Sequence, residues 1–394
     1  MSKIVLLLLA ATLSHAASIP WPLTELEATP RHWDAQTNEL GVKAVWLEGP
    51  LYQGKPTRIF AYYNVPNSSS NLPAMVLIHG GGGTAFAEWV RLWGSRGYAA
   101  IAVDTVGTVP DRADSTKLWN PTRKRHEFSG PAGWGDFKNV DAPITDQWTY
   151  HAVAASILAH SYLRILPGVD PRRIGVTGIS WGGYLTSIVA SVDRRFRFGI
   201  PVYGCGFLGE DSAWLKDFDG LGKQRAAKWL KLWDPSSYLA QGRRPMLWIN
   251  GTNDFAYPMP SWQKSYRLPK GQRILSMQVR MKHGHQDGAK PEEIDAFAKA
   301  MLMDGPALVR ISKQGEKAGA AWANYGRGTS PVRAELNFTR DSGKWQDRKW
   351  ETVSAVLDPK QRRASAKIPA GATVFYLNLT DERGLIVSSE HVPR

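Results

Sequence analysis

Between about residues 40 and 305, short runs of β-branched and aliphatic residues alternate with segments whose apolar positions recur at helical spacing. The apolar positions in 153–165 and 294–302 predict helices. This alternation is typical of an α/β fold around a largely parallel sheet. The predicted strands of that sheet are 57–65, 74–78, 98–103, 174–179, 198–203, 245–250 and 274–279.

Two long stretches interrupt this alternation, at 105–148 and 204–241, the second with a helical pattern near 224–233. Loops of this length in a compact domain usually cover or bind a ligand, and surface elaboration is the alternative. Both begin at the ends of predicted strands, on the side of the sheet where α/β enzymes place their sites. They are therefore candidate walls of a binding site.

The pattern changes after Asp304-Gly305-Pro306, where residues alternate with period two in 335–338 and 373–379. Turn residues separate these runs, which is typical of short antiparallel strands. We therefore expect a catalytic domain at 17–305 and a small accessory β-sandwich at 306–394.

Residues 1–16 have the features of a secretory signal peptide. Lys3 supplies a positive start, Ile4 to Leu13 form an apolar run, and Ser14-His15-Ala16 ends in small residues. That run is shorter than the roughly 17–25 residues that span a bilayer, so a membrane anchor is not expected. Cleavage after Ala16 would send the mature protein to the periplasm or outside the cell.

Composition narrows the function further. The chain carries 49 Lys and Arg against 35 Asp and Glu, for a net charge of +14. A protein with this positive charge could bind nucleic acid, an anionic membrane surface or an acidic polymer, but export argues against nucleic acid. The single cysteine, Cys205, excludes an intramolecular disulfide and fits a periplasm better than an extracellular space.

The strongest chemical signal is Gly178-Ile179-Ser180-Trp181-Gly182-Gly183, which follows a predicted strand and precedes a helical pattern. In the motif G-x-S-x-G, the serine sits on a strained turn that neighbouring side chains would obstruct. Ser180 is therefore the candidate nucleophile, and the backbone N–H of Trp181 a candidate donor to an oxyanion.

A second signal, His79-Gly80-Gly81-Gly82-Gly83, follows the predicted strand at 74–78. Bare glycine amides can approach a ligand closely, so Gly81 and Gly82 are candidate oxyanion donors. We expect His79 to orient this loop. A phosphate-binding loop is disfavoured, because no Lys-Ser or Lys-Thr follows the glycines.

The remaining polar groups follow two later strands. Asp254 comes after 245–250, and His283 and His285 come after 274–279. Serine, then aspartate, then histidine is the order of an α/β-hydrolase triad. Asp211 and Asp287 are less well placed as the acid. Two histidines could also form half a metal site, but no third ligand stands at a fitting spacing, so neither a metal nor a cofactor is expected.

On these motifs, residues 74–304 resemble the α/β-hydrolase superfamily, and more closely its branch of dienelactone hydrolases, prolyl-oligopeptidase-like esterases and acetylxylan esterases. The resemblance implies an α/β-hydrolase fold and a serine hydrolase. In that branch the catalytic histidine usually follows a glycine, which favours His285 over His283, although the residues alone leave both open.

The substrate is suggested by aromatic and basic residues in the long loops. Flat aromatic faces stack on sugar rings, although such residues often belong to the core. A basic cluster at Lys117 and 123–125 would attract uronate-containing polymers, unless it is simply a solvated surface.

We expect a serine esterase acting on acetyl or methyl esters of a polysaccharide. The alternatives are a prolyl-oligopeptidase-type peptidase and an inactive carbohydrate-binding protein. The candidate substrate-binding residues are Trp119, Trp134, Trp148 and Trp214.

Overall fold

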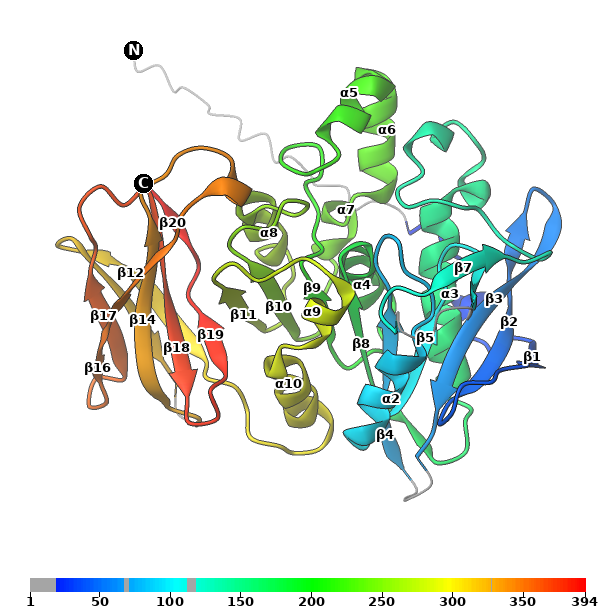
Figure 1. The fold of residues 1–394 in the computed structure, drawn as a ribbon, viewed down its shortest axis with the longest axis horizontal. Helices are drawn as coiled ribbons and strands as arrows, with labels where there is room; N and C mark the ends of the chain where they lie inside the picture. Colours follow the sequence, from blue (N-terminus) through cyan, green and yellow to red (C-terminus); the bar gives the residue numbers. More distant parts are fainter. Residues whose placement is uncertain (1–18, 67–70, 112–117, 327) are drawn as a thin grey trace, which may run out of the picture.

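The computed structural model describes residues 19–66, 71–111, 118–326 and 328–394 (Figure 1). The predicted signal peptide at 1–16 lies outside these residues, as does Lys117 of the basic cluster.

A mixed sheet forms the centre of the molecule, with the strand order β1-β2-β3-β5-β4-β8-β9-β10-β11. The strands from β5 to β11 in this order are parallel, as the alternating pattern predicted. An antiparallel edge of β1, β2 and β3 extends the sheet, and its first two strands were not predicted. The strands are β1 His32–Ala35, β2 Lys43–Tyr52, β3 Lys55–Asn64, β4 Leu72–Ile78, β5 Ala99–Val103, β8 Val169–Ile179, β9 Gly199–Val202, β10 Met246–Gly251 and β11 Arg273–Gln278.

Helices cover both faces of this sheet (Figure 1). α2 (Ala87–Ser95) and α10 (Glu292–Leu302) share one apolar core with the sheet, and α3 (Trp148–Leu163) and α4 (Trp181–Val192) share the other. α3 is buried along its whole length because the N-terminal segment packs outside it, where the Ser161 hydroxyl donates to the Leu26 carbonyl. The shorter helices are α1 Leu23–Leu26, α5 Leu215–Leu221, α6 Lys223–Trp233, α7 Ser236–Leu239, α8 Met259–Tyr266 and α9 His285–Ala289.

The strand order reverses at β4, because the strands that follow it in sequence, β5 and β8, lie on its opposite sides. Ligands of open α/β sheets bind at the carboxyl ends of the strands beside such a reversal. The glycine run 80–83 follows β4 and Ser180 follows β8, so both motifs lie at this position.

The two long interruptions contain irregular structure. The first holds a hairpin of β6 (Thr108–Asp111) and β7 (Thr122–Arg125) and the 3-10 turns η1 (Phe137–Asn139) and η2 (Ile144–Asp146). The second holds α5, α6 and α7, of which α5 and α6 stand at the top of the molecule (Figure 1).

The described residues after 305 form antiparallel sheets, which confirms the predicted β-sandwich as part of the fold. One sheet has the order β12-β13-β17-β16, and the other β15-β14-β18-β19 with β20 beside β18. The strands are β12 Ile311–Lys317, β13 Ala320–Tyr325, β14 Pro331–Thr339, β15 Glu351–Ser354, β16 Val356–Asp358, β17 Arg363–Lys367, β18 Val374–Asp381, β19 Ile386–Ser388 and β20 Val392–Pro393, with η3 (Trp345–Asp347) between β14 and β15.

The sandwich docks on the β11 edge of the main sheet. Every residue of β18 is buried, because one face lies in the sandwich core and the other meets the α/β part. On the second face, the Tyr376 hydroxyl and the Asn378 amide both donate to the Met277 carbonyl of β11.

Candidate active site

Ser180 lies on a strained turn between β8 and α4. Its backbone has φ +59° and ψ −119°, a conformation that residues other than glycine rarely adopt. A Cβ added to Gly178 would lie 2.1 Å from the Gly182 carbonyl oxygen, and one added to Gly182 would lie 1.9 Å from the Ile78 carbonyl oxygen. The glycines of the motif are therefore required by the close approach of three backbone segments.

A chain of hydrogen bonds joins Ser180 to an imidazole and a carboxylate. The Ser180 hydroxyl lies 2.8 Å from His283 Nε2, and His283 Nδ1 lies 2.6 Å from Asp254 Oδ2. The other carboxylate oxygen of Asp254 accepts the amides of Ala256 and Tyr257 at 2.9 and 2.8 Å. With Asp254 buried and held from both sides, the imidazole has one fixed tautomer, with its proton on Nδ1 and Nε2 free to accept.

Aromatic rings surround His283. Tyr203 stacks on the imidazole at 4.3 Å, and its hydroxyl donates to the Gly284 carbonyl beside it. Phe255, which is 53% exposed, lies 4.9 Å from the same ring. Tyr203 and Phe255 were not singled out from the sequence, although Phe255 directly follows the predicted acid.

The choice of His285 as the base is wrong on this geometry. Gly284 is extended and α9 begins at His285, so the ring of His285 turns away from Ser180 toward Phe86, at 4.7 Å. There its Nε2 accepts the Gly80 amide at 2.9 Å. Burial lowers the pKa of His285 to about 3, so the imidazole is neutral and able to accept this hydrogen bond.

The glycine loop is held by two histidines. While His285 accepts the Gly80 amide, His79 Nδ1 donates to the Gly80 carbonyl at 2.9 Å. The Thr105 amide in turn donates to His79 Nε2 at 3.0 Å. Both backbone groups of Gly80 are thus fixed, and His79 lies where a loop-orienting residue was expected.

The candidate oxyanion donors lie around this loop. Trp181 is the first residue of α4, so its amide has no carbonyl partner within the helix. A Cβ added to Gly81 would lie 3.1 Å from the Trp181 ring, which places the glycine loop against the start of α4. Since the Gly80 amide is occupied, Gly81 and Gly82 are the amides of this loop left as candidates.

Two of the predicted aromatic residues lie beside the nucleophile turn. Half-buried Trp134 lies next to Gly81, and the Arg123 guanidinium lies 5.0 Å from the centre of its ring. Half-buried Trp214, just before α5, lies 4.5 Å from the Trp181 ring. These positions are compatible with a surface for substrate.

The other two aromatic residues pack against buried neighbours, and the Trp148 ring lies 5.5 Å from that of Trp181. The substrate-binding role predicted for Trp148 is wrong, because this residue begins α3, is fully buried and donates from its ring nitrogen to the Thr105 carbonyl at 2.8 Å. Trp119 is half-buried against Phe86 and Trp89 of the α2 region, at 5.7 and 6.3 Å.

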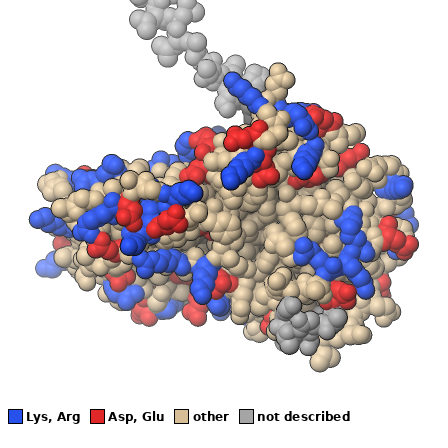
Figure 2. Space-filling view, turned by 45° about the horizontal axis from the view of Figure 1, so that its top comes forward, with Lys and Arg blue, Asp and Glu red and all other residues tan. Residues whose placement is uncertain are grey.

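Charge is distributed unevenly on the face that carries the carboxyl ends of the strands. Figure 2 shows charged side chains over the C-terminal sheets and around the projecting helices, with a mostly uncharged stretch between them. In the described part of the basic cluster, Arg123 donates to the Gly82 carbonyl and Lys124 lies 4.0 Å from Asp111. Arg123 is therefore the cluster member next to the glycine loop.

The described residues, 19–66, 71–111, 118–326 and 328–394, contain neither a metal-binding cluster nor a membrane-spanning helix. In these ranges no three His, Cys, Asp or Glu side chains gather as metal ligands. Nor does any helix in them have the length and apolarity to cross a membrane.

Two protein families match parts of the chain. Residues 23–210 match the family described as Acetyl xylan esterase (AXE1), and residues 141–302 match the Prolyl oligopeptidase family. The first match includes the glycine loop and Ser180, whereas the second includes Ser180, Asp254 and His283 but not the glycine loop. Together they support a hydrolase of the esterase type and leave a peptidase as an alternative.

A curated relative also matches part of the chain. The chain is 24% identical over 206 residues to the Uncharacterized peptidase YuxL of Bacillus subtilis (strain 168), which covers 48% of this chain and 26% of that protein. The chain thus spans about a quarter of the length of this curated relative.

Solved structures also resemble the chain. The acetyl xylan esterase of Paenibacillus sp. R4 aligns with a TM-score of 0.55 at 20% identity, over 71% of this chain and 92% of that one. Acetyl xylan esterase 1 of Thermoanaerobacterium sp. JW/SL YS485 gives 0.53 at 16% identity, over 73% and 96%. With the strand order above, these similarities confirm the predicted α/β-hydrolase fold.

Proposed function

We propose that this protein, which has an α/β-hydrolase fold, is an exported serine esterase that removes acetyl or methyl esters from a polysaccharide. The observation that carries the proposal is the continuous hydrogen-bonded chain from Ser180 through His283 to Asp254. A serine hydroxyl is a poor nucleophile alone, and a correctly oriented imidazole activates it.

In the proposed reaction, Ser180 Oγ attacks the ester carbonyl while His283 Nε2 takes its proton. Asp254 holds the imidazole and stabilises the imidazolium that forms. The amides of Trp181 and of Gly81 or Gly82 bind the oxyanion. His283 then returns the proton to the leaving alcohol, and water hydrolyses the acyl-enzyme with the same imidazole as base.

The polysaccharide part of the proposal rests on the aromatic residues around the turn. Trp134, Trp214 and exposed Phe255 offer ring faces to a sugar. Arg123 beside Trp134 would favour a chain that carries carboxylates. The signal-like sequence of residues 1–16 agrees with a substrate outside the cytoplasm.

The test compares acetate and methanol release from acetylated xylan and from esterified pectin, using wild type and Ser180→Ala. Acetate release that disappears in the variant supports an acetylesterase, and methanol release supports a methylesterase. If a folded wild type releases neither product, or if the Ser180→Ala variant keeps full activity, the proposal is wrong.

A peptidase is the second candidate, because the Prolyl oligopeptidase match spans Ser180, Asp254 and His283. The same residues would then attack an amide carbonyl. Faster turnover of an aminoacyl-nitroanilide than of nitrophenyl acetate by wild type would favour this candidate over the esterase.

A further inference from the structure

A segment of the C-terminal sandwich reaches the loop that carries Asp254. We name residues 345–350, between β14 and β15, the bracing segment. The Asn253 side-chain amide donates to three of its backbone carbonyls, those of Arg348 at 2.7 Å, Gln346 at 3.1 Å and Trp345 at 3.3 Å. Asn253 immediately precedes Asp254, so the bracing segment holds the backbone from which the carboxylate projects.

The same contacts extend to the loop that carries His283. The hydroxyl of buried Thr252 donates to Asn253 Oδ1 at 2.7 Å and accepts the Arg280 amide at 2.9 Å. Arg280 has φ +54°, a strained conformation that needs support from its surroundings. Its guanidinium also donates to the Trp350 carbonyl at 3.4 Å. A continuous path therefore links the bracing segment to both triad loops.

The bracing segment is itself fixed. The Arg348 guanidinium stacks on Trp345 at 3.7 Å, and the Lys349 amide donates to Asp341 at 2.6 Å. Trp350 is buried against Tyr376 of β18, the strand that docks on the main sheet. An element anchored in this way can impose a position on the loop that it contacts.

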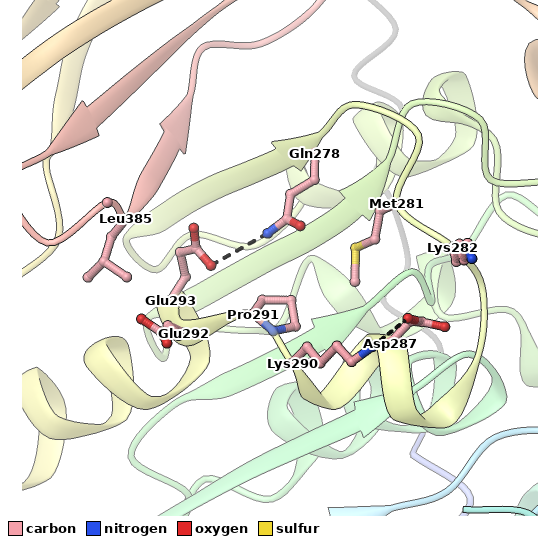
Figure 3. A pocket seen from close by; sticks show the side chains of 10 residues that line it. Gln278, Met281, Lys282, Asp287, Lys290, Pro291, Glu292, Glu293 and Leu385 are labelled. Atoms are coloured by element: carbon pink, nitrogen blue, oxygen red, sulfur yellow. Dashed lines mark hydrogen bonds and ion pairs between the residues drawn. The ribbon is translucent and has the colours of Figure 1, made fainter.

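A second connection lies beside a pocket of about 380 Å³, which Lys282 and Glu293 help to line (Figure 3). Glu293 of α10 accepts the Gln278 side-chain amide at 3.5 Å and the Ile386 backbone amide of β19 at 2.8 Å. The Met277 amide, one residue earlier, donates to the Ser388 hydroxyl at 2.7 Å. The end of β11, from which the His283 loop starts, is thus also tied to the sandwich.

We propose that the C-terminal sandwich is a positioning device for the triad, in which the bracing segment sets Asp254 and His283 through Asn253 and Thr252. The inference rests on the proposed function, since it assigns these residues to the orientation of the acid and base. None of them is proposed to touch substrate. Displacing catalytic groups by about an ångström can cost roughly 100-fold in rate.

The test uses the full chain and measures two quantities. The first is the rate at which a fluorophosphonate labels Ser180, which reports activation of the nucleophile for any substrate. The second is the pair of steady-state constants, kcat and KM, determined separately on the ester that wild type cleaves. Asn253→Ala and Thr252→Val should each slow labelling and lower kcat by roughly 10- to 100-fold, with KM unchanged. Thr252→Ser keeps the hydroxyl and should restore the wild-type rate.

Glu390→Gln is the matched control. Glu390 binds Arg267 and Arg273 at the same docking surface, but makes no hydrogen bond to the triad loops within the described residues. It should lower the melting temperature and leave labelling unchanged.

Two results would overturn the inference. One is wild-type labelling in both Asn253→Ala and Thr252→Val. The other is a labelling rate that falls in proportion to the melting temperature in every variant, Glu390→Gln included, because that would show general destabilisation. If wild type itself is not labelled, the proposed function fails first and the inference falls with it.

Discussion

The two sides of Ser180 are supported differently. On the glycine-loop side, Gly80 is held by His79 and His285, and His79 by Thr105, all within the α/β part. On the acid–base side, the loops of Asp254 and His283 are tied to carbonyls and side chains of the C-terminal sandwich. The glycine-loop side is thus held within the α/β part, whereas the acid–base side is also tied to the C-terminal sandwich.

The largest expected effect separates the two histidines. His283→Ala should lower kcat/KM by about 10⁴-fold or more, because it removes the group that activates Ser180. Steady-state kinetics with His285→Ala as the comparison will check this, since that variant should retain at least about 100-fold more activity. Equal losses of kcat/KM in the two variants would contradict the assignment of His283, and not His285, as the base.

Next in size is the effect of Trp148→Ala on the glycine-loop side. Trp148 is fully buried and supports Thr105, so its truncation should lower the free energy of unfolding by about 3–5 kcal/mol in urea titrations. Trp214→Ala is the comparison, because half-buried Trp214 should cost less stability and should raise KM instead. If the Trp148→Ala enzyme is as stable as wild type but has a raised KM, the prediction is wrong and Trp148 contributes to substrate binding.

A smaller effect is expected from Gly83→Ala. The added Cβ would lie 2.9 Å from both His285 Nε2 and His79 Nδ1, so it would push apart the rings that hold Gly80. We expect kcat to fall roughly tenfold because the candidate oxyanion amides would move. Gly220→Ala has open space around its Cβ and should leave kcat unchanged; a normal kcat for Gly83→Ala would contradict the role of these rings.

The smallest effect is a pH dependence of stability on the sandwich side. Burial lowers the pKa of His391 to about 3, against about 6.5 in an unfolded chain. The unfolded state therefore binds more protons between these values, and the stability present above pH ~6.5 falls on acidification, by up to about 1.4 kcal/mol per pH unit for this group. His391→Phe should lose about 1 kcal/mol less stability than wild type between pH ~6.5 and ~5.5 in urea titrations. The same loss of stability in the variant and in wild type over this range would show that His391 does not contribute.

The sequence predicted the parallel strands, the nucleophile turn and Asp254, because each depends on a local pattern or on chain order. It left His283 and His285 open because both lie in one loop, and the extended Gly284 and the start of α9 decide which ring faces Ser180. Trp148 was misplaced because the polar stretch before it continues into α3 without an obvious boundary. Nothing in the residues around Asn253 indicated that its partners would be carbonyls more than 90 positions away.

β18 has a consequence for how the molecule unfolds. One of its faces belongs to the core that the sandwich shares with α2 and α10, and the other packs on β11. Unfolding of the sandwich alone would therefore expose apolar surface on the sandwich and on the α/β part. The two parts should unfold together. Calorimetry should show one cooperative transition, with equal van't Hoff and calorimetric enthalpies, rather than two separate peaks.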